Sequence, residues 1–131
     1  MRYTYFALLH GSPKFIKIGQ SSNPENRVSA LDSNNPHLVT LLGYIEGAHW
    51  EKHLLDALQD SIYWGEWLIY SVDILVLVVR LLNKKEHPNE IIKEWRKERR
   101  RIKMDSIKSN LPFDLYYKQT LNFKEEGWIK P

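Results

Sequence analysis

The chain has 131 residues, enough for one domain with a modest extension, and a formal net charge of +3. It contains no cysteine, which excludes disulfides, thiolate metal sites and cysteine nucleophiles. The longest apolar run, residues 74–82, is interrupted by Arg80 and is far shorter than the roughly 20 residues that a bilayer span needs. The start of the chain has no signal-peptide pattern, so we expect a soluble, cytoplasmic protein without a membrane partner.

The positive charge is concentrated in the C-terminal part of the chain. Residues 1–82 hold six Lys/Arg against eight Asp/Glu, whereas residues 83–131 hold thirteen against eight. An electrostatic grip on nucleic acid would therefore come mainly from the C-terminal third.

The first elements are predicted to be a hairpin followed by a helix. Residues 2–9 and 15–19 are apolar and aromatic runs typical of strands, and the turn-forming residues 10–14 separate them. Alternation places Tyr5 and Lys17 where they could share one surface of the sheet. Either Ser22 or Asn23 is expected to cap the helix, with Pro24 in its first turn and Arg27 one turn further on.

The rest of the core is predicted as strand, helix, turn and helix. Residues 38–45 form a third strand, and a helix opening at Gly47 carries a core stripe at helical spacing. The stripe consists of Trp50, Leu54, Ala57 and Leu58. Residues 64–70 are a turn or short strand, and Ser71 caps an apolar helix that reaches Leu82. We therefore expect residues 1–83 to form a small α/β (α+β) domain, a three-stranded, mostly antiparallel sheet flanked by helices.

Residues 84–131 are predicted to be a C-terminal helical extension. Pro88 suits a helix start, and residues 89–108 are charged and favour a helix. The remainder is too aromatic for a free linker, so we expect it to pack against its own core or a partner. Exposed cations of the helix are candidates for contacts with the DNA backbone: Arg96, Lys97, Arg100, Arg101 and Lys103. The interleaved glutamates leave a solvated helix with internal ion pairs as the alternative.

Four fragments, in a specific order and spacing, resemble the GIY-YIG nuclease superfamily, in particular its phage and mobile-element branch. Tyr5 matches the tyrosine of the first motif, and Lys17-Ile18-Gly19 stands where Tyr-Ile-Gly usually stands. Arg27 lies ten positions beyond Lys17, and Gly65-Glu66-Trp67-Leu68 is similar to the closing Gly-Glu-Trp-Phe. The resemblance covers roughly residues 3–82. It implies a metal-dependent DNA endonuclease acting on duplex or branched substrates.

The residue types suit this chemistry. Glu66 is a hard oxygen ligand for a single Mg²⁺ or Mn²⁺, and Arg27 offers a planar fork of donors to phosphoryl oxygens. Lys17 adds a point charge. The resemblance implies that Tyr5 accepts the proton of the attacking water, for which neighbouring Lys17, Arg27 and the metal would have to lower its pKa. Tyr3, on the same strand face, is expected to orient the water or the phosphate.

Other functions stay open from the sequence. Tyr3-Thr4 replaces the Gly-Ile of the first motif, and Leu55 replaces a histidine that is usual in the family. The rival hypothesis is therefore an inactive relative that binds DNA or acts as an adaptor or inhibitor. A third is an interaction protein that forms a homodimer, or binds a protein partner, through its aromatic tail. His49 and His53, with Asp56 and Asp60 on the same side, are either metal ligands or, as we expect, a solvated helix face.

Overall fold

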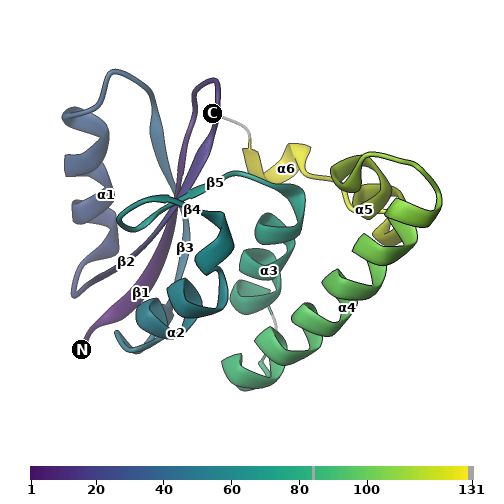
Figure 1. The fold of residues 1–131 in the computed structure, drawn as a ribbon. Coiled ribbons are helices and arrows are strands. Elements are labelled where there is room, and N and C mark those ends of the chain that lie inside the picture. The colour runs from purple at the N-terminus through teal and green to yellow at the C-terminus, as the bar shows by residue number, and fades with distance from the viewer. Residues whose placement is uncertain (84, 130–131) are drawn as a thin grey trace. The chain divides into compact units, whose positions relative to one another are not determined.

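The computed structural model of the chain describes residues 1–83 and 85–129. The elements, in chain order, are β1 (Tyr3–Leu9), β2 (Phe15–Ser21), α1 (Pro24–Ser33), β3 (Val39–Glu46), α2 (Trp50–Ala57), a short 3₁₀ helix (Gln59–Ser61), β4 (Ile62–Trp64), β5 (Trp67–Ile69), α3 (Val72–Asn83), α4 (Pro88–Lys108), α5 (Phe113–Leu121) and α6 (Glu126–Ile129). They form two compact units (Figure 1). The first comprises residues 1–70 and the chain's end from Trp128, and the second comprises residues 71–127. The expected domain 1–83 thus contains residues 1–70 of the first unit together with α3 of the second.

The first unit is built on an antiparallel sheet with strand order β3-β1-β2-β5-β4. The mixed α/β class and the antiparallel sheet are confirmed, but the expected number of three strands was wrong, because the described residues form a sheet of five. The two additional strands, β4 and β5, have only three residues each. So short a segment cannot display the alternating pattern by which a strand is identified in a sequence.

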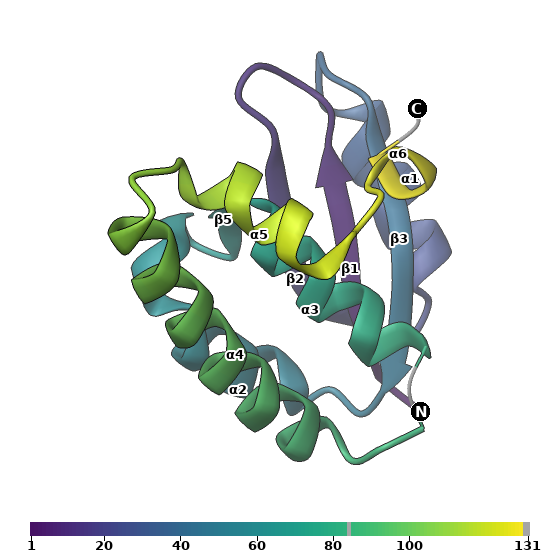
Figure 2. The same ribbon diagram turned by 90° about the vertical axis from the view of Figure 1, so that its right-hand side faces the viewer.

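Helix α1 covers one face of the sheet and encloses a small apolar core. In Figure 2 the helix lies behind β3. Tyr5 and Ala7 of β1, Val28 of α1 and Val39 at the start of β3 form a buried cluster, and partly buried leucines complete it. Those leucines are Leu9, Leu31 and Leu41. Because β1 is an inner strand of the sheet, this core places α1 directly over Tyr5 and the candidate site residues next to it.

The boundaries of α1 and α2 follow from local chemistry. Asn23 caps α1, since its side-chain oxygen accepts a hydrogen bond from the Asn26 amide at 3.2 Å, and Pro24 occupies the first turn. The structure thereby chooses Asn23 over Ser22. Helix α2 begins at Trp50, three residues after Gly47, and contacts β1 and β2. Of the predicted stripe, Trp50, Leu54 and Leu58 are buried.

The second unit is a cluster of helices in which α3, α4 and α5 contact one another (Figure 2). Trp95 of α4 is fully buried and donates a hydrogen bond from Nε1 to the carbonyl oxygen of Asp73 at 2.8 Å. Tyr117 of α5 is also fully buried, which raises the pKa of its hydroxyl. The expectation that the aromatic tail packs is confirmed at Tyr117, inside its own unit. Across the described residues, no helix has both the length and the apolar character that crossing a membrane requires.

Candidate active site

The pairing of β1 with β2 puts the candidate residues on the face of the sheet that α1 covers. Tyr5 lies opposite Gly19 and Ala7 lies opposite Lys17. Residues that are directly opposite in neighbouring strands point to the same face, and so do residues two apart in one strand. Tyr5 and Lys17 therefore share the face that holds the Tyr5, Ala7 and Val28 core.

Tyr5 is 1% exposed and makes a side-chain hydrogen bond with Arg27 of α1. The pKa of its hydroxyl is raised above the ordinary value of 10.0, because burial outweighs the opposing effect of the Arg27 charge. The groups of the chain alone thus raise this pKa, and the lowering expected from the sequence would have to come from the bound metal. Arg27 is exposed at the surface of α1, so its guanidinium can meet a ligand while it holds the phenol.

Gly19 is the residue over which the Tyr5 ring lies. A Cβ atom built on Gly19 would be 2.5 Å from both Cζ and Oη of Tyr5, far inside van der Waals contact. Close packing thus explains why this position of the Lys-Ile-Gly motif is a glycine. Any side chain there would displace the Tyr5 ring, which contacts Arg27. Its backbone needs no unusual conformation, so close approach alone accounts for the residue.

Lys17 and Glu66 form an ion pair beside the tyrosine, with Nζ and Oε2 2.8 Å apart. The Lys17 side chain is 9% exposed, whereas that of Glu66 is 42% exposed, so the carboxylate is the accessible partner. The Lys17 ammonium also lies over the Trp67 ring, 5.2 Å from its centroid. The ammonium is therefore held between a carboxylate and an aromatic face.

The loop between β4 and β5 presents Glu66. Gly65 has a φ of +58°, a left-handed conformation that favours glycine in a tight turn. The carbonyl oxygen of Glu66 accepts a hydrogen bond from the Ile18 amide at 3.2 Å, which fixes this residue against β2. Gly65 makes the turn, and the backbone bond places the carboxylate next to Lys17.

Sequence reasoning missed Glu51, in the first turn of α2. Burial is the main cause that raises the pKa of its carboxyl, the Glu66 charge adds to the increase, and a hydrogen bond with Gln20 opposes it. Its Oε2 atom is buried without a hydrogen-bond partner among the described residues. Its place beside buried Trp50 in an amphipathic helix was the available signal, but helical spacing alone does not reveal that α2 approaches Glu66.

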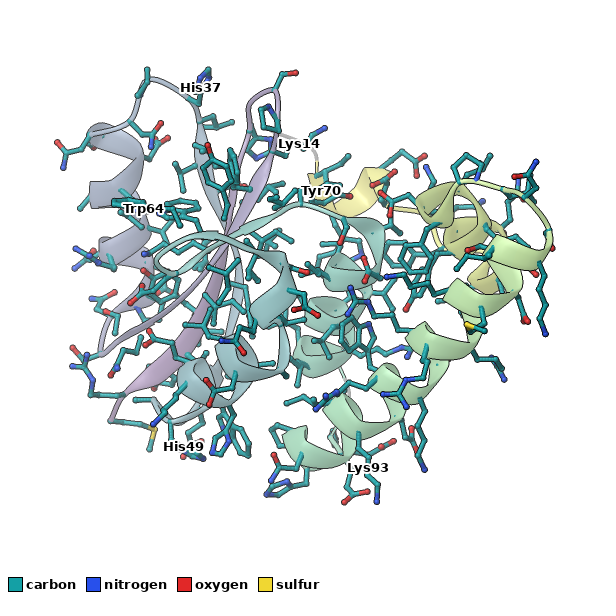
Figure 3. All side chains as sticks on the ribbon, viewed as in Figure 1. Lys14, His37, His49, Trp64, Tyr70 and Lys93 are labelled. Atoms are coloured by element: carbon teal, nitrogen blue, oxygen red, sulfur yellow. The ribbon has the colours of Figure 1, made fainter. Side chains whose placement is uncertain are left out.

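Tyr3 and the histidine pair of α2 lie elsewhere. Tyr3 is on the same strand face as Tyr5, but its ring packs edge-on against Tyr44 of β3, with 5.0 Å between the centroids. His49 (Figure 3) and His53 are exposed, and the His49 ring packs against Trp50 at a tilt of 41°, with 4.3 Å between the centroids. Within the described residues, no three His, Cys, Asp or Glu side chains gather as a metal-binding group.

The donors present nonetheless suit one hard cation. Mg²⁺ keeps several of its waters and is often bound through one or two carboxylates together with substrate phosphate oxygens. Glu66 supplies an accessible carboxylate, and Glu51 adds negative charge nearby. Arg27 and Lys17 supply cationic donors for a phosphate beside it. The side chains therefore fit a single Mg²⁺ or Mn²⁺ that substrate oxygens help to hold.

The basic residues of α4 belong to the second unit. Arg96, Lys97, Arg100, Arg101 and Lys103 are all exposed. Glu98, one of the interleaved acids, pairs with Arg80 of α3 at 2.9 Å. Lys97 and Arg101 border shallow hollows along α4, so a row of cations is presented by one helix.

Comparison with known proteins does not identify the chain: no family model matches it, and no curated protein or solved structure shows a significant match.

Proposed function

We propose that the chain is a metal-dependent endonuclease that hydrolyses phosphodiester bonds of DNA through a single-metal site. The observation that supports this best is the convergence of Tyr5, Arg27, Lys17 and Glu66 on one face of a sheet. Two direct contacts join them in pairs, although the residues come from two neighbouring strands, a helix and a turn. This is the residue set that the resemblance to GIY-YIG nucleases implies.

Each side chain has a role that its contacts allow. Arg27 holds the scissile phosphate and offsets its developing negative charge, and Lys17 adds a second positive charge. Tyr5 accepts the proton of the attacking water while the water oxygen bonds to phosphorus. The bond to the 3′ oxygen then breaks, and that oxygen takes a proton from solvent. A Mg²⁺ or Mn²⁺ ion held by Glu66 would supply charge stabilisation at the leaving oxygen.

The Lys17–Glu66 ion pair would affect how a metal ion and a DNA phosphate bind at the site. At 2.8 Å, the Lys17 ammonium is paired with one oxygen of the carboxylate, Oε2. The exposed remainder of Glu66 is open to a cation, and an incoming phosphate offers Lys17 a second partner. We therefore expect metal and DNA to bind more tightly together than separately.

A second candidate function is supported by two observations. The carboxylate of Glu66 already has a partner, and the pKa of Tyr5 is raised, which disfavours the ionised form needed for a base. An inactive relative that binds DNA, or serves as an adaptor or inhibitor of a phage or mobile element, would have these properties. Whether the chain is an active nuclease or an inactive relative, the exposed cations of α4 would form its DNA-binding surface.

Cleavage of DNA by the full chain tests the proposal. Supercoiled plasmid and a labelled branched duplex are incubated at low salt with Mg²⁺, with Mn²⁺ or with a chelator. We expect nicking only with metal and a loss of at least about 100-fold in Arg27→Ala, because one lost transition-state donor costs about 10²–10³ in rate. Arg27→Lys should recover only part of it, since lysine lacks the fork. DNA binding without cleavage would instead support the inactive relative.

A further inference from the structure

Exposed aromatic rings form a pocket next to the candidate active site, on the same face of the sheet. The pocket holds about 210 Å³. Its lining residues are Leu9, Phe15, Asn35, Tyr63, Trp64 and Trp67. Tyr63 is 66% exposed and Trp64 is 74% exposed, although large aromatic side chains usually bury most of their surface. Figure 3 shows Trp64 at the β4–β5 hairpin.

The pocket is continuous with the candidate active site. Trp67 lines the pocket and also lies under the Lys17 ammonium, at 5.2 Å. Glu66 sits between Trp64 and Trp67 in the turn itself. A group in the pocket would therefore contact Trp67, which follows Glu66, the proposed metal ligand, in the sequence. The same ring lies under Lys17, the cation proposed to bind phosphate.

The shape and chemistry of the pocket suit one planar ring system. Its volume corresponds to roughly seven waters, at about 30 Å³ each, and is below the range of pockets that enclose drug-sized ligands. Phe15 and Tyr63 already pack as a pair, with 5.0 Å between their centroids, so part of the aromatic wall is pre-formed. Asn35 is the polar lining residue. Its Oδ1 accepts from the His37 amide at 3.1 Å, which leaves the amide hydrogens to meet an acceptor.

We infer that this pocket binds an unpaired nucleobase of the DNA strand that the active site cleaves. The inference rests on the proposed function and names its substrate class, DNA with an extrahelical or single-stranded base beside the scissile phosphate. A base has the flat apolar faces that stack on aromatic side chains, edge acceptors for Asn35, and a phosphate attached at the distance of one nucleotide. The acidic first unit also needs such a contact, because it has five Lys/Arg against seven Asp/Glu in residues 1–70 and attracts DNA weakly by charge.

Binding measured without metal tests this directly, since no strand can be cut. The probe is a labelled duplex with a single bulged 2-aminopurine, compared with the same duplex carrying an abasic residue in the bulge and with a fully paired duplex. We expect the native chain to bind the bulged base about 5- to 150-fold more tightly than the abasic bulge, the range that stacking on aromatic side chains gives. The fluorescence of 2-aminopurine should fall as it stacks.

Variants assign the effect to the pocket. Trp64→Ala should remove the preference for the bulged base, and Trp64→Phe should keep most of it. Leu38→Ala, an exposed apolar residue of the same unit that does not line the pocket, is the matched control and should change nothing. Unchanged binding of the paired duplex by Trp64→Ala shows that the variant has folded.

Two results would overturn the inference: equal affinity of the native chain for base and abasic bulges, or a preference that survives in Trp64→Ala. If Trp64→Ala instead abolishes self-association in sedimentation and leaves DNA binding unchanged, the pocket is an interface between copies of the chain, and the inference is also overturned. Base-dependent binding by a chain that never cleaves DNA would contradict the proposed function alone. Cleavage without base dependence would contradict the inference alone.

Discussion

At the scale of single residues, the contact between Gly19 and Tyr5 is the tightest constraint in the site. Gly19→Ala would place a Cβ atom 2.5 Å from the phenol and force the ring to move away from its position at Arg27. We expect the free energy of unfolding to fall by about 1–3 kcal/mol, the usual cost of overpacking. Cleavage should fall by about 100-fold, because small misplacements of a catalytic group have effects of this size. Urea unfolding and plasmid nicking measure the two quantities.

Gly127→Ala is the control for this substitution. Among the described residues, a Cβ atom there would have no heavy atom within 4 Å, so cleavage should stay as in the native chain and the free energy of unfolding should not fall. If Gly19→Ala matched the control in both measurements, the position of the Tyr5 ring over Gly19 would have no functional importance.

Tyr5 determines how cleavage should depend on pH. Its pKa is raised above 10.0, so the ionised fraction is small at neutral pH and grows about tenfold with each pH unit below that pKa. We expect the cleavage rate to rise from pH 7 to pH 9.5 without a plateau. Tyr5→Phe should lower the rate by about 10²–10⁴ and flatten the profile, because the base is gone. A plateau near pH 8 in the native chain, or an unchanged rise in Tyr5→Phe, would argue against tyrosine as the base.

At the scale of elements, the start of α1 decides where Arg27 lies. Asn23→Ala removes the hydrogen bond to the Asn26 amide and should lower the free energy of unfolding by about 1 kcal/mol. Ser22→Ala, at the other cap position considered from the sequence, should change it by less than about 0.5 kcal/mol. Chemical denaturation of both variants gives the comparison. If the free energy of unfolding fell more in Ser22→Ala than in Asn23→Ala, Ser22 would be the cap and Asn23 would not.

The elements that the sequence predicted well are those with strong local signals. The β1–β2 hairpin, the cap of α1 and the Pro88 start of α4 come from alternation, capping chemistry and proline, all of which act over a few residues. Strands β4 and β5 were described only as a turn or short strand. Strand β5 pairs with β2, whose partner residues lie 50 to 54 positions earlier in the chain, and a local pattern cannot reveal such a pairing.

At the scale of the whole molecule, the parts of the site that could be predicted are those that lie in short sequence fragments. Tyr5, Lys17, Arg27 and Glu66 stand in the fragments that resemble the GIY-YIG motifs, so their grouping could be expected from the sequence. Glu51 and the pocket around Trp64 have no motif, because both arise from the packing of distant segments. The direction of the pKa shift of Tyr5 also depends on its burial, which the sequence pattern does not reveal, whereas the nearby cations can be read from the sequence.

Positive charge and the candidate site belong to different units of the chain. Residues 71–127 contain thirteen Lys/Arg against nine Asp/Glu, whereas residues 1–70 are net acidic. In the proposed function, the basic helix α4 would give general affinity for DNA, while the first unit would provide the chemistry. In the proposed function, cleavage would therefore depend on the first unit, and above all on the carboxylate of Glu66.

The most direct measurement is metal-dependent nicking of supercoiled plasmid by the native chain, Glu66→Ala and Glu46→Ala, each titrated with Mg²⁺ at low salt. Glu46 is an exposed glutamate at the end of β3, so its variant matches the loss of charge without touching the Lys17 pair. We predict cleavage by the native chain and Glu46→Ala and none by Glu66→Ala at any Mg²⁺ concentration. Native activity in Glu66→Ala, or no cleavage by the native chain with either Mg²⁺ or Mn²⁺, would contradict it.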